Sequence, residues 1–425
     1  LERAPEVLLD INGKGPQWRD VENSGAMVLV RGRWCRGELI ETPEEGGQRL
    51  ARAGGSQDER VLTGRNARPA LGLWRRWLRE CGGEPFGRRP TEPLECRVRH
   101  QTTLQNEHRR RRYSWAVTRP FRFGVQAKMA TSQKQWNEQA RRAEDLGYSV
   151  LTLPDHFDGQ LAPTPALMAA ATATTNLRVG ALVYSNDYRH PVVFANEMAT
   201  IDLLSDGRLE LGMGAGWMTF DYEAAGIPHD RAGVRIERMI EAVEVVRGLF
   251  DDGPLNYEGE HYRVNELDLQ PKPVQDHVPL LVGGGGPRML RLAGRLADIV
   301  GVNLNLQSGV IDAGTVSDGT PDRYLEKISW IREGATDRFD DIELHIRTHL
   351  VLFTDVRLGT AESFGGGMGL SVQEALGSPA ALVGDSSSMI DDVVARREKF
   401  GFSYTTVSVD VMEQFAPVVA ELAGA

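Results

Sequence analysis

The chain has 425 residues, of which 41% are hydrophobic, and a formal net charge of −10. A chain of this length can bury a large core, and no apolar run approaches the roughly 18 residues that a membrane-spanning helix needs. We therefore expect no membrane partner. We also expect no secretory signal, because the basic run 109–112 is not followed by an apolar segment.

Charge and composition change near Val117. Residues 1–118 hold 21 Arg and 1 Lys against 16 Asp and Glu, while the remainder is strongly acidic. The first part also contains all three cysteines, whose spacing fits no metal site, so a reduced cytoplasm is the simplest location. We predict an Arg-rich extension of low order over residues 1–118 and a folded domain over residues 119–425.

Three interpretations of the extension stay open. Arginine with interleaved tryptophan suits a nucleic-acid-binding arm. The lack of sustained periodicity and the Gly and Pro clusters also fit a disordered extension. The extreme Arg to Lys ratio fits upstream DNA read from a start codon assigned too early, with the true start near Val117.

Short runs rich in β-forming residues alternate with helical patterns after residue 119. The predicted strands are 121–127, 150–153, 179–184, 209–213, 280–282, 299–302, 344–353 and 404–409. The predicted helices are 132–147, 165–174, 191–204, 230–250, 287–296, 321–336 and 388–400. We also expect a hairpin over 257–270 and a glycine-rich loop at 365–369.

This alternation predicts a (β/α)8 TIM barrel. A doubly wound sheet would need G-x-G-x-x-G after the first strand, and the sequence has none there. In a parallel barrel all strand carboxyl ends share one rim, and the site is built on that rim.

The clearest candidate site follows the fifth strand. Successive glycines let the backbone approach a ligand, and the next helix offers free N–H groups and a positive dipole end. We predict that this turn holds a phosphate or diphosphate. Its residues are Gly283, Gly284, Gly285, Gly286, Pro287 and Arg288.

Other polar or small residues end the second, third and fourth strands. His156 can move a proton, and Asp155 can orient it or bind a ring N–H. Gly214 and Gly216 leave room for a flat ring, and Trp217 would form one side of that pocket. Hydrogen bonds to such a heteroaromatic ring would come from Tyr184, Ser185 and Asn186. No histidine spacing indicates a metal, so we predict no metal site.

Several motifs in order resemble the luciferase-like monooxygenase superfamily, and more narrowly its branch that uses the deazaflavin coenzyme F420. The resemblance covers about 119–422. Its motifs are FGVQ, LPDHF, SNDYRHP, GRLELGMGAGW, YEGEHYRV with LQPKPVQ, and GGGGPRMLRLAGRLADIV.

The resemblance implies a homodimeric barrel that binds F420 in the mouth formed by the strand carboxyl ends. It assigns His156 as the active-site acid/base and Asp155 to the cofactor ring. It places Leu182 and Val183 in a bulge with a cis peptide behind the ring, and Asn303 beside the phosphate-binding turn. The implied reaction is hydride transfer between a small-molecule substrate and the deazaflavin C5.

Two departures from the resemblance narrow the substrate. Relatives that oxidise glucose 6-phosphate carry a Trp where this chain has Gln160, and a Glu where it has Trp217. We therefore expect an apolar or cyclic carbonyl, enone or alcohol. The alternatives are an FMN-dependent monooxygenase with a separate reductase, a flavin-binding protein without turnover, and a nucleic-acid binder. The acidic domain argues against the last.

Overall fold

The structure, a computed structural model, describes residues 27–30, 33–36, 119–311 and 313–425. The chain divides into two compact units. In the N-terminal unit, β1 (Met27–Val30) and β2 (Arg33–Arg36) form an antiparallel hairpin that the sequence analysis did not predict. The other predictions for residues 1–118, including the Arg-rich extension of low order, lie outside the described residues.

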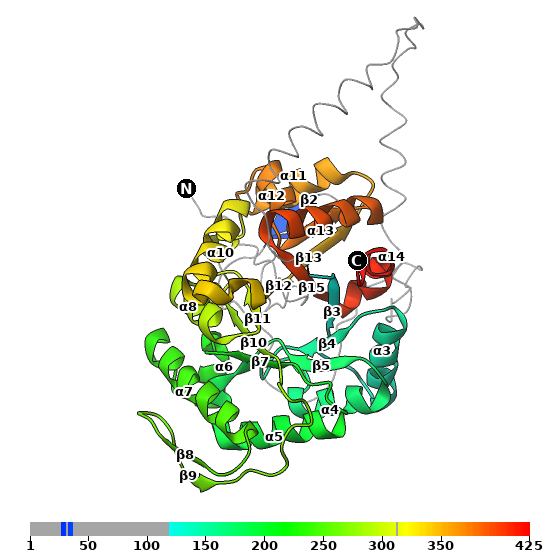
Figure 1. The fold of residues 1–425 in the computed structure, drawn as a ribbon. Coiled ribbons are helices and arrows are strands. Elements are labelled where there is room, and N and C mark those ends of the chain that lie inside the picture. The colour runs from blue at the N-terminus through cyan, green and yellow to red at the C-terminus, as the bar shows by residue number, and fades with distance from the viewer. Residues whose placement is uncertain (1–26, 31–32, 37–118, 312) are drawn as a thin grey trace, which may run out of the picture. The chain divides into compact units, whose positions relative to one another are not determined.

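The second unit is built on a parallel sheet, with its strands central and the large helices around them (Figure 1). Its strands are β3 (Arg122–Gln126), β4 (Val150–Leu153), β5 (Arg178–Ala181), β6 (Tyr184–Ser185), β7 (Leu211–Gly214), β10 (Leu280–Gly284), β11 (Ile299–Val302), β12 (Glu343–Arg347) and β15 (Phe402–Ser408). Their order is β5-β4-β3-β15-β12-β11-β10-β7-β6.

β5 and β6 are two halves of one strand, interrupted by the cis peptide between Leu182 and Val183. β6 pairs with β7, and a parallel bridge from Val179 to Leu209 joins β5 to the chain just before β7. The sheet therefore closes on itself with one strand for each predicted position. The predicted (β/α)8 TIM barrel and the cis peptide are both confirmed.

The helices outside the barrel begin where local signals place them. Ser132 caps α3 by accepting a hydrogen bond from the Gln135 N–H, and Pro191 occupies the first turn of α5. Gly401, at φ 83°, ends α13. These outer helices are α3 (Gln133–Asp145), α4 (Pro163–Ala173), α5 (Pro191–Leu204), α7 (Ala232–Phe250), α8 (Pro287–Leu296), α10 (Pro321–Ala335), α13 (Ser386–Phe400) and α14 (Met412–Leu422).

Several short elements decorate this frame. The predicted hairpin is confirmed as β8 (Leu255–Glu258) paired with β9 (Arg263–Leu267). The sequence analysis missed α6, α9, α14 and three 3-10 turns. The missed short elements are α6 (Thr219–Ala225), α9 (Ala313–Ser317), η1 (Asn186–Tyr188), η2 (Thr336–Asp341) and η3 (Val409–Val411).

Two predictions between β12 and β15 are wrong. The single strand 344–353 is two strands: β12 stays in the barrel, and β13 (Leu350–Phe353) pairs outside it with β14 (Ala381–Gly384). The predicted glycine-rich loop is mostly helix, α11 (Arg357–Gly367), which precedes α12 (Val372–Gly377). Gly365 is buried against Ala375 of α12, so the glycine serves close helix packing.

The main hydrophobic core lies between the outer faces of the strands and the helices. A second, small cluster made of Val150, Leu281, Ile299 and Tyr404 packs with Leu182 and Val183. It is built from strand residues that point inward. The interior of the barrel is therefore packed below its mouth, which leaves the strand carboxyl ends to form a site.

Candidate active site

His156 follows β4 and is held by Asp221 of α6. The His156 Nδ1 lies 2.5 Å from the Asp221 Oδ2, and Asp221 is fully buried. Tyr188 O–H also donates to this carboxylate at 3.4 Å. Burial and the charge of Asp221 raise the pKa of Tyr188, so its phenol stays protonated. Because Nδ1 of His156 meets the carboxylate, Nε2 is the ring nitrogen that Asp221 does not contact.

Trp217 stands edge-on to His156, with 5.8 Å between ring centroids and an interplanar angle of 90°. The structure thus brings together two residues predicted for the site. The side chain of Gln160, predicted for the substrate pocket, donates to the backbone oxygens of Pro154 and Leu161 at 2.7 and 3.3 Å. Its amide N–H groups stabilise the loop after β4.

Asp155 is buried and bound by Arg189. The Arg189 Nη1 lies 2.6 Å from one carboxylate oxygen, and Nη2 lies 3.2 Å from the other. The Ser185 N–H also donates to this carboxylate, at 3.0 Å. Asp155 therefore links the end of β4 to β6. A cofactor ring could contact this carboxylate only next to the two groups that already donate to it, the Arg189 guanidinium and the Ser185 N–H.

The three predicted hydrogen-bonding residues after Val183 face different ways. Tyr184 packs on Phe194 of α5 with 4.9 Å between ring centroids, so its side chain belongs to the helix layer. The Asn186 amide donates to the Tyr262 hydroxyl at 3.3 Å. Ser185 Oγ is buried and makes no hydrogen bond of normal geometry with any described residue.

The predicted glycines make room for protein neighbours. A Cβ on Gly214 would lie 2.6 Å from Val183 Cγ2, and one on Gly283 would lie 3.3 Å from Val183 Cγ1. Gly216 has φ 74°, and a Cβ there would lie 1.9 Å from the Tyr222 hydroxyl. Gly214 and Gly283 therefore make room for the side chain of Val183, which the sequence analysis did not foresee.

The turn from Gly284 to Arg288 is tightly packed except at its last glycine. A Cβ would lie 2.4 Å from the Met289 side chain at Gly284 and 2.1 Å from the Leu304 oxygen at Gly285. At Gly286, which caps α8, the nearest atom would be Asn305 Oδ1 at 3.8 Å. Pro287 opens α8 as expected. Arg288 lies in its first turn, 2.7 Å from Glu237.

Asn303 lies beyond β11 and is tied to the protein. Its Oδ1 accepts from the Leu304 N–H at 2.8 Å and lies 3.1 Å from His349 Nε2. Its backbone oxygen accepts from the Lys327 ammonium at 2.9 Å. Asn303 therefore fixes the segment that backs the glycine turn.

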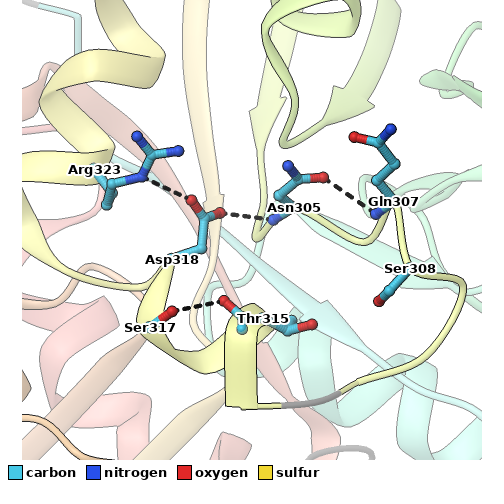
Figure 2. Close-up of a pocket in the computed structure, with 8 residues that line it drawn as sticks. Asn305, Gln307, Ser308, Thr315, Ser317, Asp318 and Arg323 are labelled. Carbon is cyan, nitrogen blue, oxygen red and sulfur yellow. Dashed lines mark hydrogen bonds and ion pairs between the residues drawn. The ribbon is translucent and has the colours of Figure 1, made fainter.

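A cavity of about 410 Å³ opens beside this segment. Figure 2 shows Asp318 between Arg323 and Asn305. The Arg323 Nε donates to Asp318 Oδ1 at 3.0 Å, and the Asn305 backbone N–H donates to Asp318 Oδ2 at 2.7 Å. Because Asn305 also faces Gly286, the cavity adjoins the glycine turn. The residues that line it are Asn305, Gln307, Ser308, Gly314, Thr315, Ser317, Asp318 and Arg323.

Two residues that sequence reasoning missed complete the site, namely Asp221 and Arg189. Asp221 is 65 residues from His156 and lies on a short helix that was not predicted. Arg189 stands within the quoted motif SNDYRHP, so the only local signal for it was its nearness to Asn186. Within the described residues, no group of three or more His, Cys, Asp or Glu could hold a metal ion.

None of the helices in the described ranges is long and apolar enough to cross a membrane. Charged pairs lie at the carboxyl ends of the strands: His156 with Asp221, and Asp155 with Arg189. Enzymes with this barrel place their chemistry at that end.

Comparison with known proteins matches residues 116–310 to the family model of the luciferase-like monooxygenases. The F420-dependent glucose-6-phosphate dehydrogenase of Microbacterium testaceum is 32% identical over 223 residues, which are 50% of this chain and 61% of that protein. The 5,10-methylenetetrahydromethanopterin reductase of Archaeoglobus fulgidus is 29% identical over 209 residues, 47% and 61% of the two chains.

The solved structure of the coenzyme F420-dependent tetrahydromethanopterin reductase from Methanopyrus kandleri has the same fold. It matches with a TM-score of 0.58 at 20% identity and covers 72% of this chain and 99% of that one. The chain spans only 61% of the length of the two curated relatives described above. Residues 116–310 are therefore similar to the luciferase-like monooxygenase family, and the chain shares the barrel fold of the solved structure.

Proposed function

We propose that this chain is an oxidoreductase that uses coenzyme F420 to transfer a hydride to or from a small carbonyl, enone or alcohol. The observation that carries the proposal is the His156–Asp221 pair at the barrel mouth. Two relatives support the choice of coenzyme and reaction. One is named an F420-dependent glucose-6-phosphate dehydrogenase, and the other a 5,10-methylenetetrahydromethanopterin reductase.

The residues of the mouth fit a flat ring with an anionic tail. Val183 projects into the mouth between glycines and offers an apolar surface for a ring face. Ser185 Oγ is buried without a normal hydrogen bond among the described residues, so a polar ring edge could satisfy it. Gly286 leaves open space at the α8 N-terminus, where a phosphate would meet backbone N–H groups.

The side chains at the mouth would supply orientation and a proton. The coenzyme, when bound, supplies a C5 that exchanges a hydride with the substrate carbon. Neutral His156, with its Nδ1 proton held by Asp221, would take the proton of an alcohol at Nε2 as the hydride leaves. In the opposite direction the imidazolium would give that proton to a carbonyl oxygen, with Asp221 stabilising its charge.

The wall of the mouth supports a substrate with an apolar or cyclic body. Trp217 presents its indole next to His156. Gln160 uses its amide on the backbone of its own loop. An aromatic wall favours a hydrophobic group beside the reacting carbon.

Binding spectra test the proposal and its rival. The purified chain should bind F420 with a Kd at least about tenfold below that for FMN, as absorbance titrations would measure. A preference for FMN, with turnover only in the presence of dioxygen and a flavin reductase, would favour the FMN-dependent monooxygenase. The description of the matching family model favours that second candidate.

We also propose a homodimer in the cytoplasm. Leu203, Leu204 and Val274 are exposed, and the Val274 N–H donates to Asp202 next to the first two. Such an apolar surface suits contact with a second copy. Light scattering during size-exclusion chromatography measures the assembly, and cell fractionation measures the location.

A further inference from the structure

The two sides of the barrel mouth differ in charge balance. Near β4, β6 and β7 the acidic groups have basic partners: Asp155 pairs with Arg189, Asp221 with His156, and Asp187 with Arg238. On the opposite side, where β12 ends, the prominent charge is the guanidinium of Arg347.

Arg347 points into the barrel at the end of β12. Along this strand Glu343 reaches Arg122 and His345 reaches Thr406, so alternate residues face inward and Arg347 continues the series. Its Nε donates to Gln126 Oε1 at 2.9 Å. Its Nη1 donates to the Thr348 backbone oxygen.

Both partners of Arg347 are neutral. The Gln126 amide in turn donates to the Leu182 backbone oxygen at 3.4 Å. Two hydrogen bonds therefore connect the guanidinium to the cis peptide between Leu182 and Val183. Arg347 makes no ion pair with any carboxylate of the described residues, although Asp410 attracts it from a greater distance. Its charge is therefore left without a contacting counterion.

The neighbouring histidines are neutral and do not compensate this positive charge. Burial lowers the pKa of Arg347 to about 10, which leaves it charged at neutral pH. Burial, Arg347 and Lys128 lower the pKa of His349 to about 3, so His349 is neutral. Burial, Arg122 and Arg347 likewise lower the pKa of His345 to about 3. Arg347 therefore acts as a cation on this side of the mouth, with the carboxylate of Asp410 outside contact.

We propose that Arg347 binds an anionic oxygen group of a ligand in the barrel mouth. A carboxylate or phosphate matches the planar fork of a guanidinium and replaces the missing counterion. This inference rests on the proposed function and refines it. The ligand would be either a substrate that carries an anionic group in addition to its reacting carbonyl or alcohol, or the coenzyme through one of its anionic oxygens.

The direct test is titration with inorganic phosphate, followed by isothermal calorimetry on the full chain. Wild type should bind phosphate with millimolar affinity, and Arg347→Gln should weaken binding about tenfold or more. The matched control is Arg263→Gln, because Arg263 lies on the exposed hairpin and pairs with Glu258. This control should bind phosphate as wild type does.

Thermal unfolding shows whether each variant folds. If Arg347→Gln does not fold, Arg347→Lys decides, because it keeps the charge but loses the planar fork, and it should weaken phosphate binding about threefold or more. Equal phosphate affinity in wild type and Arg347→Gln overturns the proposal, and so does equal affinity in wild type and Arg347→Lys.

Competition identifies the source of the anion. Phosphate that weakens F420 binding to wild type, but not to Arg347→Gln, assigns the site to the coenzyme. Phosphate that spares F420 binding but competes with carboxylate-bearing alcohols assigns it to the substrate. A wild-type chain that binds no F420 would end the proposed function, while the phosphate titration would still decide the role of Arg347.

Discussion

His156 and Asp221 are 65 residues apart in the chain, yet their side chains meet at 2.5 Å at the mouth of the barrel. The carboxylate is fully buried, so the imidazole supplies much of its compensation. In return, the carboxylate holds the Nδ1 side of the His156 ring. Nε2 is the ring nitrogen that Asp221 does not contact.

Replacing Asp221 by Asn should lower kcat about 10- to 100-fold. The amide can still contact the ring, but it no longer stabilises an imidazolium or enforces the tautomer. The Kd for F420 should stay within about twofold, because Asp221 acts through His156. Steady-state absorbance assays measure the first quantity and binding titrations the second.

The comparison variants are His156→Ala and Glu223→Gln. His156→Ala should cost about 10²-fold or more in kcat, as expected for a lost acid/base. Glu223 is exposed on the same helix, so its substitution should change nothing. Full turnover by Asp221→Asn would mean that the pair is only structural.

The glycine turn after β10 offers a matched pair of substitutions. In Gly285→Ala the new methyl would lie 2.1 Å from the Leu304 oxygen, so we expect a loss of about 1–3 kcal/mol in unfolding free energy. Gly286→Ala fits, since φ is −96° and the nearest atom is 3.8 Å away.

Gly286→Ala should therefore keep the melting temperature of wild type while it weakens F420 binding by about tenfold, because the methyl occupies space proposed for the phosphate. Differential scanning calorimetry and absorbance titration separate the two effects. F420 affinity equal to wild type would place the anionic tail elsewhere.

At the opposite end of the barrel, Arg122 holds the buried carboxylate of Glu210 and the partly buried carboxylate of Glu343. It lies 2.6 Å from Glu210 and 2.7 Å from Glu343, whose side chains are 5% and 13% exposed. Arg122→Met would leave both charges without this partner and should cost about 3 kcal/mol in urea unfolding. Removing the exposed Arg263 should cost under about 0.5 kcal/mol. Similar losses in both variants would contradict this account.

Stability should fall in acid because of His345. Burial, Arg122 and Arg347 lower its pKa to about 3, while the unfolded chain has a value near 6.5. The unfolded state therefore binds more protons between these values. The contribution of His345 is complete above about pH 6.5 and is lost as the pH falls towards 3.

Replacing His345 by Gln should reduce the slope of the unfolding free energy against pH by up to about 1.4 kcal/mol per pH unit. His349, whose pKa is also lowered to about 3, keeps part of the slope. Urea unfolding at several pH values measures the difference. A variant with the same slope as wild type would show that His345 does not titrate in this range.

Most of the barrel could be predicted from local signals. Proline at a first helical turn and the turn at Asp206-Gly207 gave α5 its observed bounds, Pro191–Leu204. Short β-rich runs gave each barrel strand to within a few residues. The errors lie at β13 and α11, because an apolar run does not reveal which sheet it joins, and glycines tolerate a helix when they pack closely.

The chain alone determined which residues end up at the strand carboxyl ends, because that placement depends only on strand and helix periodicity. Closure of the barrel decided what those residues touch. It set Arg189 on Asp155, Asp221 on His156, and Arg347 opposite neutral partners. Such contacts join residues 34, 65 and 221 positions apart, so no local pattern encodes them.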